Sequence, residues 1–468
     1  MGPTAPERAG LNVRRLPPNI FAVVMATGIV SLALNGAGQS ILAHILFWLN
    51  VGLYSILLIL LLVRTLRYRA DLAADLASHA RAPGFFTLVA ASCVLGNQCV
   101  LLFGVGAAGM TLWVVGVVFW LPLTYLMLPG LMEGTEKPKP ELEVNGAWLL
   151  AVVGTQAISV LACLLVPWLA EDAPDGPLFV ALVFWLVGSM LYVWLIALIF
   201  HRILFLPLSP GELTPPYWIN MGAMAISTLA GVRLVAEAGR MPLLTELLPF
   251  LKGMTLLFWA TGTWWIPILL ALGAWRHLFK RVPLTYDHGY WAAVFPLGMY
   301  TVCTQNLIRE FRLPFLEPIP AVFVWVALVA WGLTFAGLVW HVATSMRERT
   351  MPVPSVVPNK VPEAKPQSSQ GRAPMDKSVE AVAPLSGLRA VSRYQWLVFL
   401  VVWAGWTLDA ADFGLFSLVL RPPMIDLLGG NPSMADIGKY GRPLVAGLLV
   451  GAFGGSFNRV TAFPALRC

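Results

Sequence analysis

Ten runs of apolar residues, separated by short polar segments, occupy most of the first 345 positions of the chain. Each run is long enough to cross the ~30 Å hydrocarbon core of a bilayer as an α-helix, which takes about 20 residues. The pattern therefore predicts an all-α membrane protein. The expected spans are 17–35, 41–63, 85–103, 110–131, 147–169, 178–200, 216–236, 250–274, 286–306 and 318–341.

Basic residues are distributed unevenly between the two sides of these spans. Fifteen lysines and arginines fall on segments that share a side with residues 1–16, whereas four fall on the other side: Arg240, Lys252, Arg309 and Arg312. Positively charged loops stay in the cytoplasm. We therefore expect a multi-pass protein of the cell (inner) membrane, with residues 1–16 in the cytoplasm and residues 17–345 as one ten-helix domain.

Composition supports a membrane protein and argues against several other classes. Hydrophobic residues make up 58% of the chain, charged residues 12%, and the mean hydropathy is +0.75. The formal net charge of +7 gathers in loops, so it does not indicate a nucleic-acid partner. Five cysteines form no CxxC pair, and six histidines lack a carboxylate at ligand spacing. We expect no metal, no cofactor and no enzymatic activity.

A weak repeat marks the odd-numbered spans. Its copies start at Ala26, Ala91, Ala157, Ala225 and Ala293, separated by 65, 66, 68 and 68 residues. This near-constant spacing predicts five helical hairpins, with an odd helix out and an even helix back. The third position is small in four copies and aromatic in the fifth: Gly28, Cys93, Ser159, Ser227 and Phe295.

Small residues let helices approach closely, or leave space where a side chain would have been. Five equivalent helices could surround a pore lined by the four small residues and filled by Phe295. Pro296 follows Phe295, and a proline inside a helix removes a hydrogen bond and bends the helix. The pattern predicts Phe295 and Pro296 as a pore gate near mid-membrane; the alternative interpretation is helix packing alone.

Four segments, 21–30, 218–230, 262–267 and 290–296, resemble the tellurite-resistance/dicarboxylate transporter family, which includes slow-type anion channels. The resemblance covers about residues 12–345. It implies five hairpins around a pore lined by the odd helices, usually in a homotrimer that passes small anions. Chloride, nitrate, sulfite, tellurite and C4-dicarboxylates are substrates within the family, and its pore-blocking phenylalanine falls on Phe295.

Charged residues are absent from the central portions of the ten spans, and Arg233 and Glu237 lie at the outer end of the seventh. A proton-driven carrier usually keeps a titratable group in its path. The absence favours a small-anion channel or exporter, while a proton-coupled carboxylic-acid transporter stays as the alternative. The amides of Gln98, Gln156 and Asn220 either line the pore or bond neighbouring helices.

The chain changes character after residue 345. Residues 346–392 are rich in Pro, Ser, Lys and Glu, which predicts a flexible cytoplasmic linker. Residues 393–468 hold a further apolar span with Asp409 and Asp412 near its middle. This part resembles the first two helices of a major facilitator superfamily proton symporter, whose first-helix acids take part in proton coupling. Because two helices cannot form that transport path, we expect a truncated, inactive fragment; the alternative interpretation is a regulatory appendage.

Overall fold

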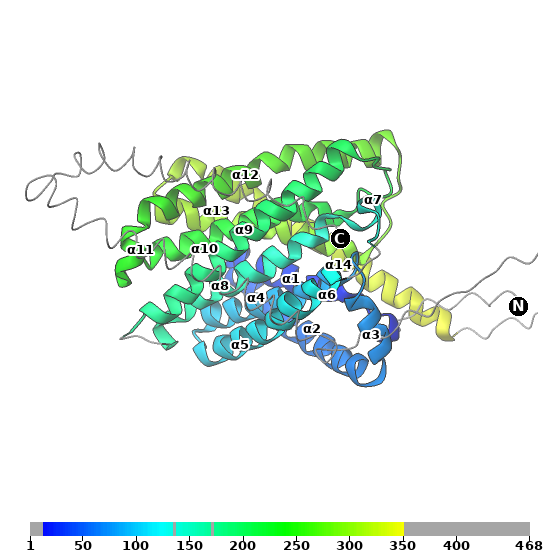
Figure 1. Cartoon of the computed structure of the whole chain (residues 1–468), viewed down its shortest axis with the longest axis horizontal. Coiled ribbons are helices and arrows are strands. Elements are labelled where there is room, and N and C mark those ends of the chain that lie inside the picture. Colours follow the sequence, from blue (N-terminus) through cyan, green and yellow to red (C-terminus); the bar gives the residue numbers. More distant parts are fainter. Residues whose placement is uncertain (1–12, 134–136, 170–172, 351–468) are drawn as a thin grey trace, which may run out of the picture. The chain divides into compact units, whose positions relative to one another are not determined.

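The computed structural model describes residues 13–133, 137–169 and 173–350, which form helices joined by turns (Figure 1). No strand occurs in this part of the chain, and the predicted all-α membrane class is confirmed. The linker beyond residue 350, the C-terminal fragment with Asp409 and Asp412, and Cys468 lie outside the described residues.

Each odd-numbered span is an inner helix that begins with a short 3-10 turn. The inner helices are α1 (Ala22–Gly36), α4 (Phe86–Phe103), α8 (Leu150–Leu169), α10 (Ile219–Ala236) and α13 (Trp291–Phe311). The preceding turns are η2 (Pro18–Phe21), η3 (Ala82–Phe85), η5 (Gly146–Leu149), η6 (Pro215–Trp218) and η9 (His288–Tyr290).

The local sequence explains why these turns start where they do. Proline occupies one of the first positions of η2, η3 and η6, where its missing N–H would have no helical partner. In η5 and η9 a side chain does the capping: Asn145 accepts the N–H of Ala147, and Asp287 accepts the N–H of Gly289. Such caps satisfy backbone donors that the first turn leaves free.

Each even-numbered span is an outer helix. These are α2 (Ser40–Arg67), α5 (Gly106–Pro122) continued by η4 (Leu123–Met127) and α6 (Leu128–Glu133), α9 (Asp175–Phe205), α12 (Leu248–Ala274) continued by η8 (Trp275–Phe279), and α14 (Pro318–Thr350). Short elements complete the connections: η1 (Val13–Arg15), α3 (Arg69–Leu76), α7 (Pro140–Glu143), η7 (Ala238–Arg240), α11 (Pro242–Glu246) and η10 (Pro314–Leu316).

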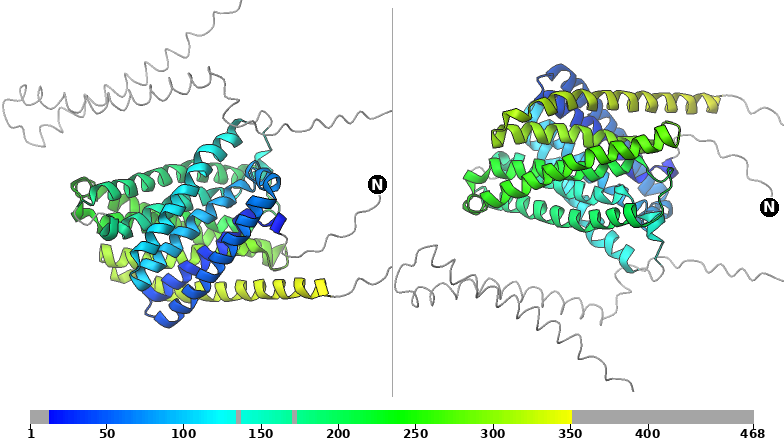
Figure 2. Two further views of the ribbon diagram at one scale, coloured as in Figure 1. Left: turned by 90° about the horizontal axis from the view of Figure 1, so that it is seen from below. Right: turned by 90° about the horizontal axis from the view of Figure 1, so that it is seen from above.

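The helices match the ten predicted spans, with differences at their ends. Within the described residues nine are both long and apolar enough to cross a membrane. The remaining one, α13, has 21 residues, and the polar side chains of Gln305 and Asn306 lower its hydropathy. Helix α14 continues to Thr350, five residues into the predicted linker, and projects beyond the other helices in Figure 2.

The five inner helices close into a ring. Helix α1 packs against α4 and α13, α4 against α8, α8 against α10, and α10 against α13. Each outer helix packs against the inner helix of its own hairpin, so the predicted five hairpins are present. Between 78% and 94% of the residues in the apolar windows of α1, α4, α8 and α10 are buried, against 11–33% in the outer helices.

Hydrogen bonds also join each outer helix to the inner helix of the next hairpin. The five bonds link Tyr54 to Ser92, Trp120 to Thr155, Trp185 to the carbonyl of Ser227, Trp259 to Thr304, and Trp331 to Thr27, at 2.8–3.0 Å. In four of them an indole N–H of the outer helix donates. We call these five bonds the hydrogen-bond belt. Because the last of them connects α14 back to α1, the belt runs around the whole bundle.

Candidate functional site

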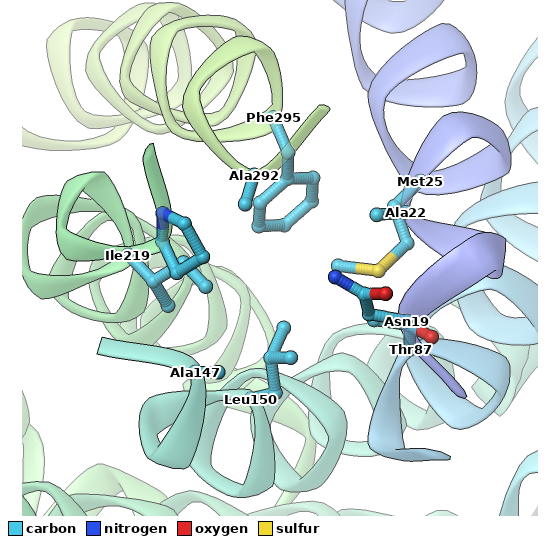
Figure 3. A pocket seen from close by; sticks show the side chains of 10 residues that line it. Asn19, Ala22, Met25, Thr87, Ala147, Leu150, Ile219, Ala292 and Phe295 are labelled. Atoms are coloured by element: carbon cyan, nitrogen blue, oxygen red, sulfur yellow. The ribbon is translucent and has the colours of Figure 1, made fainter. Parts of the chain in front are cut away.

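A small cavity lies inside the ring, at the N-terminal ends of the inner helices (Figure 3). All five inner helices, or the turns before them, contribute to its lining: Asn19, Ala22, Met25, Thr87, Ala147, Leu150, Pro216, Ile219, Ala292 and Phe295. The cavity measures about 10 Å³, which is room for about one water molecule. No space for a polyatomic anion exists at this level.

The ring of Phe295 borders this cavity from the side of α13. Figure 3 shows the side chains of Phe295, Met25 and Leu150 pointing toward one another from α13, α1 and α8. Only 1% of Phe295 is exposed. Apart from Asn19 and Thr87 the named lining is apolar, and the hydroxyl of Thr87 donates to the carbonyl of Gly84 at 2.7 Å. The arrangement is a hydrophobic constriction on the axis of the inner ring.

Two close approaches hold the first half of α13 between its neighbours. A Cβ added at Gly222 of α10 would lie 2.7 Å from Cγ of Pro296. A Cβ added at Gly298 would lie 2.8 Å from Cγ2 of Ile29 in α1. Pro296 cannot donate a backbone hydrogen bond to the carbonyl of Ala292. The turn that carries Phe295 therefore packs tightly between α10 and α1, and it lacks one internal hydrogen bond.

The four small residues of the repeat do not line this cavity, contrary to the expected equal depth with Phe295. Phe295 is the fifth residue of α13, whereas the others come later in their helices: Gly28 seventh, Cys93 eighth, Ser227 ninth and Ser159 tenth. The repeat aligned similar residues, but the helices start at different offsets from them. Phe295 accordingly lies toward the N-terminal end of its span and not at its middle.

The contacts of these small residues are those of helix packing. A Cβ at Gly28 would lie 2.5 Å from Val94 of α4, and a Cβ at Gly116 of α5 would lie 2.9 Å from Sγ of Cys93. The hydroxyl of Ser159 donates to the carbonyl of Ala181 in α9 at 2.7 Å. Ser227 donates to the carbonyl of Ala223 in its own helix. Their small size lets neighbouring helices approach.

Two of the three buried amides bond to other helices. Gln98 accepts a hydrogen bond from Asn50 at 2.7 Å, and Gln156 donates to the carbonyl of Trp185 at 3.1 Å. These contacts favour the interhelical interpretation for Gln98 and Gln156. Asn220 is fully buried, and neither polar atom of its side chain has a partner among the described residues.

Sequence reasoning missed most of the lining of the cavity. Met25, Leu150, Ile219 and Ala292 are ordinary apolar residues near the ends of apolar runs, and nothing in a hydropathy pattern separates them from lipid-facing residues. One signal could have located their level: proline precedes three of the odd spans, at 17–18, 83 and 215–216. Aligning the spans on those helix starts would have brought these positions together.

The fold and the constriction inside the inner ring define a polytopic α-helical membrane protein of the channel or transporter class. Comparison with known proteins identifies the family. Residues 15–339 match the model of the SLAC1 family, described as voltage-dependent anion channel, and the chain belongs to this family. The resemblance to slow-type anion channels is thereby confirmed.

Individual relatives match the chain over lengths of 156 to 352 residues. An uncharacterized transporter of Methanocaldococcus jannaschii is 27% identical over 328 residues, which is 69% of this chain and 92% of the relative. A sulfite efflux pump of Arthroderma benhamiae is 26% identical over 352 residues, 70% of this chain and 91% of the pump. An uncharacterized membrane protein of Mycobacterium tuberculosis is 42% identical over 156 residues, 33% of this chain and 79% of the relative.

Proposed function

We propose that the protein is a channel or exporter for small anions, and that Phe295, with Pro296 after it, closes the passage inside the inner ring. The observation that carries this proposal is the meeting of five helix N-termini around an apolar constriction filled by an aromatic ring. The N-terminal end of a helix carries a partial positive charge of about half an elementary charge. Five such ends favour an anion at this level without any charged side chain.

Opening requires the ring of Phe295 to leave the axis. Rotation of its side chain, or a small shift of the first turns of α13, would open a passage from the cavity into the space between the later turns of the inner helices. Pro296 supports the second route because the carbonyl of Ala292 has lost its helical donor. Because Gly222 and Gly298 pack closely against Pro296 and Ile29, such a shift would have to be small.

The substrate belongs to the class of small anions. The relatives named sulfite efflux pumps favour a small oxyanion such as sulfite, and chloride, nitrate, tellurite and C4-dicarboxylates are the other members to test. We further infer transport without catalysis, a homotrimer in the cell membrane, and a cytoplasmic N-terminus, which the charge distribution and the family resemblance support.

Substitution Phe295→Ala tests the gate. Purified protein in liposomes should show a severalfold rise in basal anion conductance, because the ring that fills the constriction is gone. The loss of thermal stability should stay below the ~3–5 kcal/mol typical of removing a fully packed Phe, since Phe295 borders a cavity.

Phe86→Ala is the matched control. Phe86 is also 1% exposed, but it packs against Gly154 of α8, where an added Cβ would lie 3.3 Å from its ring. This variant should lose stability without gaining conductance. Unchanged conductance in stable Phe295→Ala protein would falsify the gate. The reversal potential in pH and anion gradients tests the alternative, because a proton-coupled carboxylic-acid carrier would follow pH.

A further inference from the structure

Three outer helices carry an arginine at the same place, three residues before their last residue: Arg64 in α2, Arg202 in α9 and Arg276 in η8 after α12. All three ends lie on the side of the bundle where the inner helices begin. The three guanidinium groups have different partners, and the difference indicates a candidate anion-binding site.

Arg64 and Arg202 each find a carboxylate in the chain. Nη2 of Arg64 lies 2.5 Å from Oδ2 of Asp75, and its Nη1 donates to the carbonyl of Leu16 at 2.8 Å. Nη2 of Arg202 lies 3.5 Å from Oε2 of Glu212, and its Nη1 donates to Tyr217. Both guanidinium groups are almost fully buried, with 2% and 4% of the side chain exposed. Burial of a charge requires such a partner.

Arg276 has no carboxylate. Its Nη1 donates to the carbonyl of Leu213, and no acidic group among the described residues forms an ion pair with it. The Nε–H groups of Arg64 and Arg276 are both buried without an acceptor, although Arg276 as a whole is partly exposed. Of these two guanidinium groups, that of Arg64 has a counter-charge in Asp75 and that of Arg276 has none among the described residues. The Nε–H of Arg233 in α10 is likewise buried without an acceptor, but Arg233 does not line this cavity. A bound anion would give Arg276 the counter-charge that Arg64 and Arg202 receive from carboxylates of the chain.

The place for that anion is a cavity of about 210 Å³ beside Arg276. We call it the α12–α13 cavity. Three groups of residues form it: Leu269, Leu272 and Gly273 of α12 with Arg276 and His277; Leu213–Trp218 except Pro216; and Leu284, Tyr290 and Ala293. A guanidinium at one end of a largely apolar space suits a ligand with an anionic head and an apolar tail.

The rim of the cavity points to the membrane as the source of this ligand. Leu278, Phe279 and Leu284 are 73%, 78% and 75% exposed, although they are large and apolar. Lys280 directly follows Phe279 in sequence, and its Nζ lies 5.9 Å from the centroid of the Trp275 ring. Exposed apolar side chains next to basic ones are typical of a segment at the headgroup level of a bilayer with anionic lipids.

We propose that the α12–α13 cavity binds the phosphate group of an anionic phospholipid, with Arg276 as its principal partner. The guanidinium donates to the phosphate oxygens, and the apolar part of the lipid lies along Leu269 and Leu272. The shared chemistry is that of a phosphate ester, so a soluble phosphate is the second source to be distinguished.

This site is adjacent to the central constriction. Pro215 and Ala293 line the α12–α13 cavity, while their chain neighbours Pro216 and Ala292 line the central one. A ligand in the α12–α13 cavity would therefore contact η6 and the first turn of α13, two segments that also line the central cavity beside Phe295. A lipid there would set how far α13 can move; this regulatory consequence rests on the proposed function, whereas the binding itself does not.

The test measures lipid binding to delipidated full-length protein by native mass spectrometry, with phosphatidylglycerol, phosphatidylcholine and inorganic phosphate as probes. Arg276→Gln removes the charge. Gly273→Leu fills the cavity and leaves Arg276 in place, because a Cβ at Gly273 meets no atom within 4 Å. Lys280→Gln controls for surface charge. Gly253→Leu controls for a larger side chain in α12, since a Cβ there also meets nothing within 4 Å.

Phosphatidylglycerol should bind the wild type and both controls, and should bind Arg276→Gln and Gly273→Leu at least tenfold more weakly. Competition by inorganic phosphate at similar concentration would support the phosphate site and assign it a soluble ligand. Equal binding of phosphatidylcholine, unchanged binding in both cavity variants, or an equal loss in Lys280→Gln would overturn the proposal.

Conductance separates the two proposals. If both hold, phosphatidylglycerol should change the conductance of the wild type and leave that of Phe295→Ala nearly unchanged. Specific lipid binding without any gating effect of Phe295→Ala would leave the lipid site standing and refute the gate.

Discussion

Four inner helices, α1, α4, α8 and α10, are about as apolar as the five outer helices, yet they are far more buried. The hydropathy ranges of the two sets overlap, while burial separates them completely. Lipid tails are as apolar as leucine, so an outer helix needs only apolar residues on the face it presents to the membrane. An inner helix meets protein on most sides, so it needs small residues at close approaches, and most of its hydroxyl groups bond to carbonyls of the protein.

The same division runs through single outer helices. In α9, Trp185 is fully buried, and its indole donates to the carbonyl of Ser227 at 3.0 Å. More than two helical turns later in α9, Trp194 is 62% exposed. A hydropathy scale gives the two tryptophans one value, and only the face on which each lies separates their roles.

Substituting these two tryptophans should give the largest effect. Trp185→Ala removes a large buried side chain and its hydrogen bond, which should cost about 3–5 kcal/mol of stability. Trp194→Ala should cost little, because its side chain faces away from the protein. Thermal unfolding of detergent-solubilised protein measures both. Equal losses would mean that the outward face of α9 is packed as tightly as the inward one.

Enlarging a glycine tests the close approach of inner helices. Gly222→Leu places a side chain where a Cβ alone would lie 2.7 Å from Pro296, and such overpacking should cost about 1–3 kcal/mol. Gly52→Leu in α2 is the control, since a Cβ there meets nothing within 4 Å. The same unfolding assay should show no loss for Gly52→Leu. Unchanged stability of Gly222→Leu would contradict the tight contact between α10 and α13.

The smallest effect should come from the belt of hydrogen bonds. Trp120→Phe removes the indole donor to Thr155 but keeps most of the aromatic volume. Interhelical hydrogen bonds in membranes average ~0.6 kcal/mol, so a loss near that value is expected. A double-mutant cycle with Thr155→Val isolates the pair. A coupling energy of zero would show that the bond does not hold the outer helix to the ring.

The sequence predicted the spans closely but not the depth of Phe295. Long apolar runs with charged ends specify helix position because the bilayer sets their length. The repeat of small residues was different. It was aligned by residue similarity, whereas height in the bundle depends on where each 3-10 turn begins. That start is set by the caps Asn145 and Asp287 before two inner helices and by prolines before the other three.

The arginines at the ends of three outer helices show a second limit. Arg64, Arg202 and Arg276 all count as basic residues at the ends of apolar runs, and nothing in the sequence separates them. Their carboxylate partners Asp75 and Glu212 lie on other elements, which only the folded chain brings within reach. The absence of a partner beside Arg276, on which the lipid site depends, could not be predicted from charge positions along the chain.

By itself, the sequence determined the membrane class, the ten helices, the hairpin repeat and the family resemblance, because apolar length and local motifs are properties of the chain. Only the tertiary structure decided that the inner helices close into a ring, that Phe295 meets Met25 and Leu150, and that Gly28, Cys93 and Ser159 pack against neighbouring helices. Those outcomes depend on the rotation and height of each helix. Both are set by contacts between residues far apart in sequence, so hydropathy along the chain does not encode them.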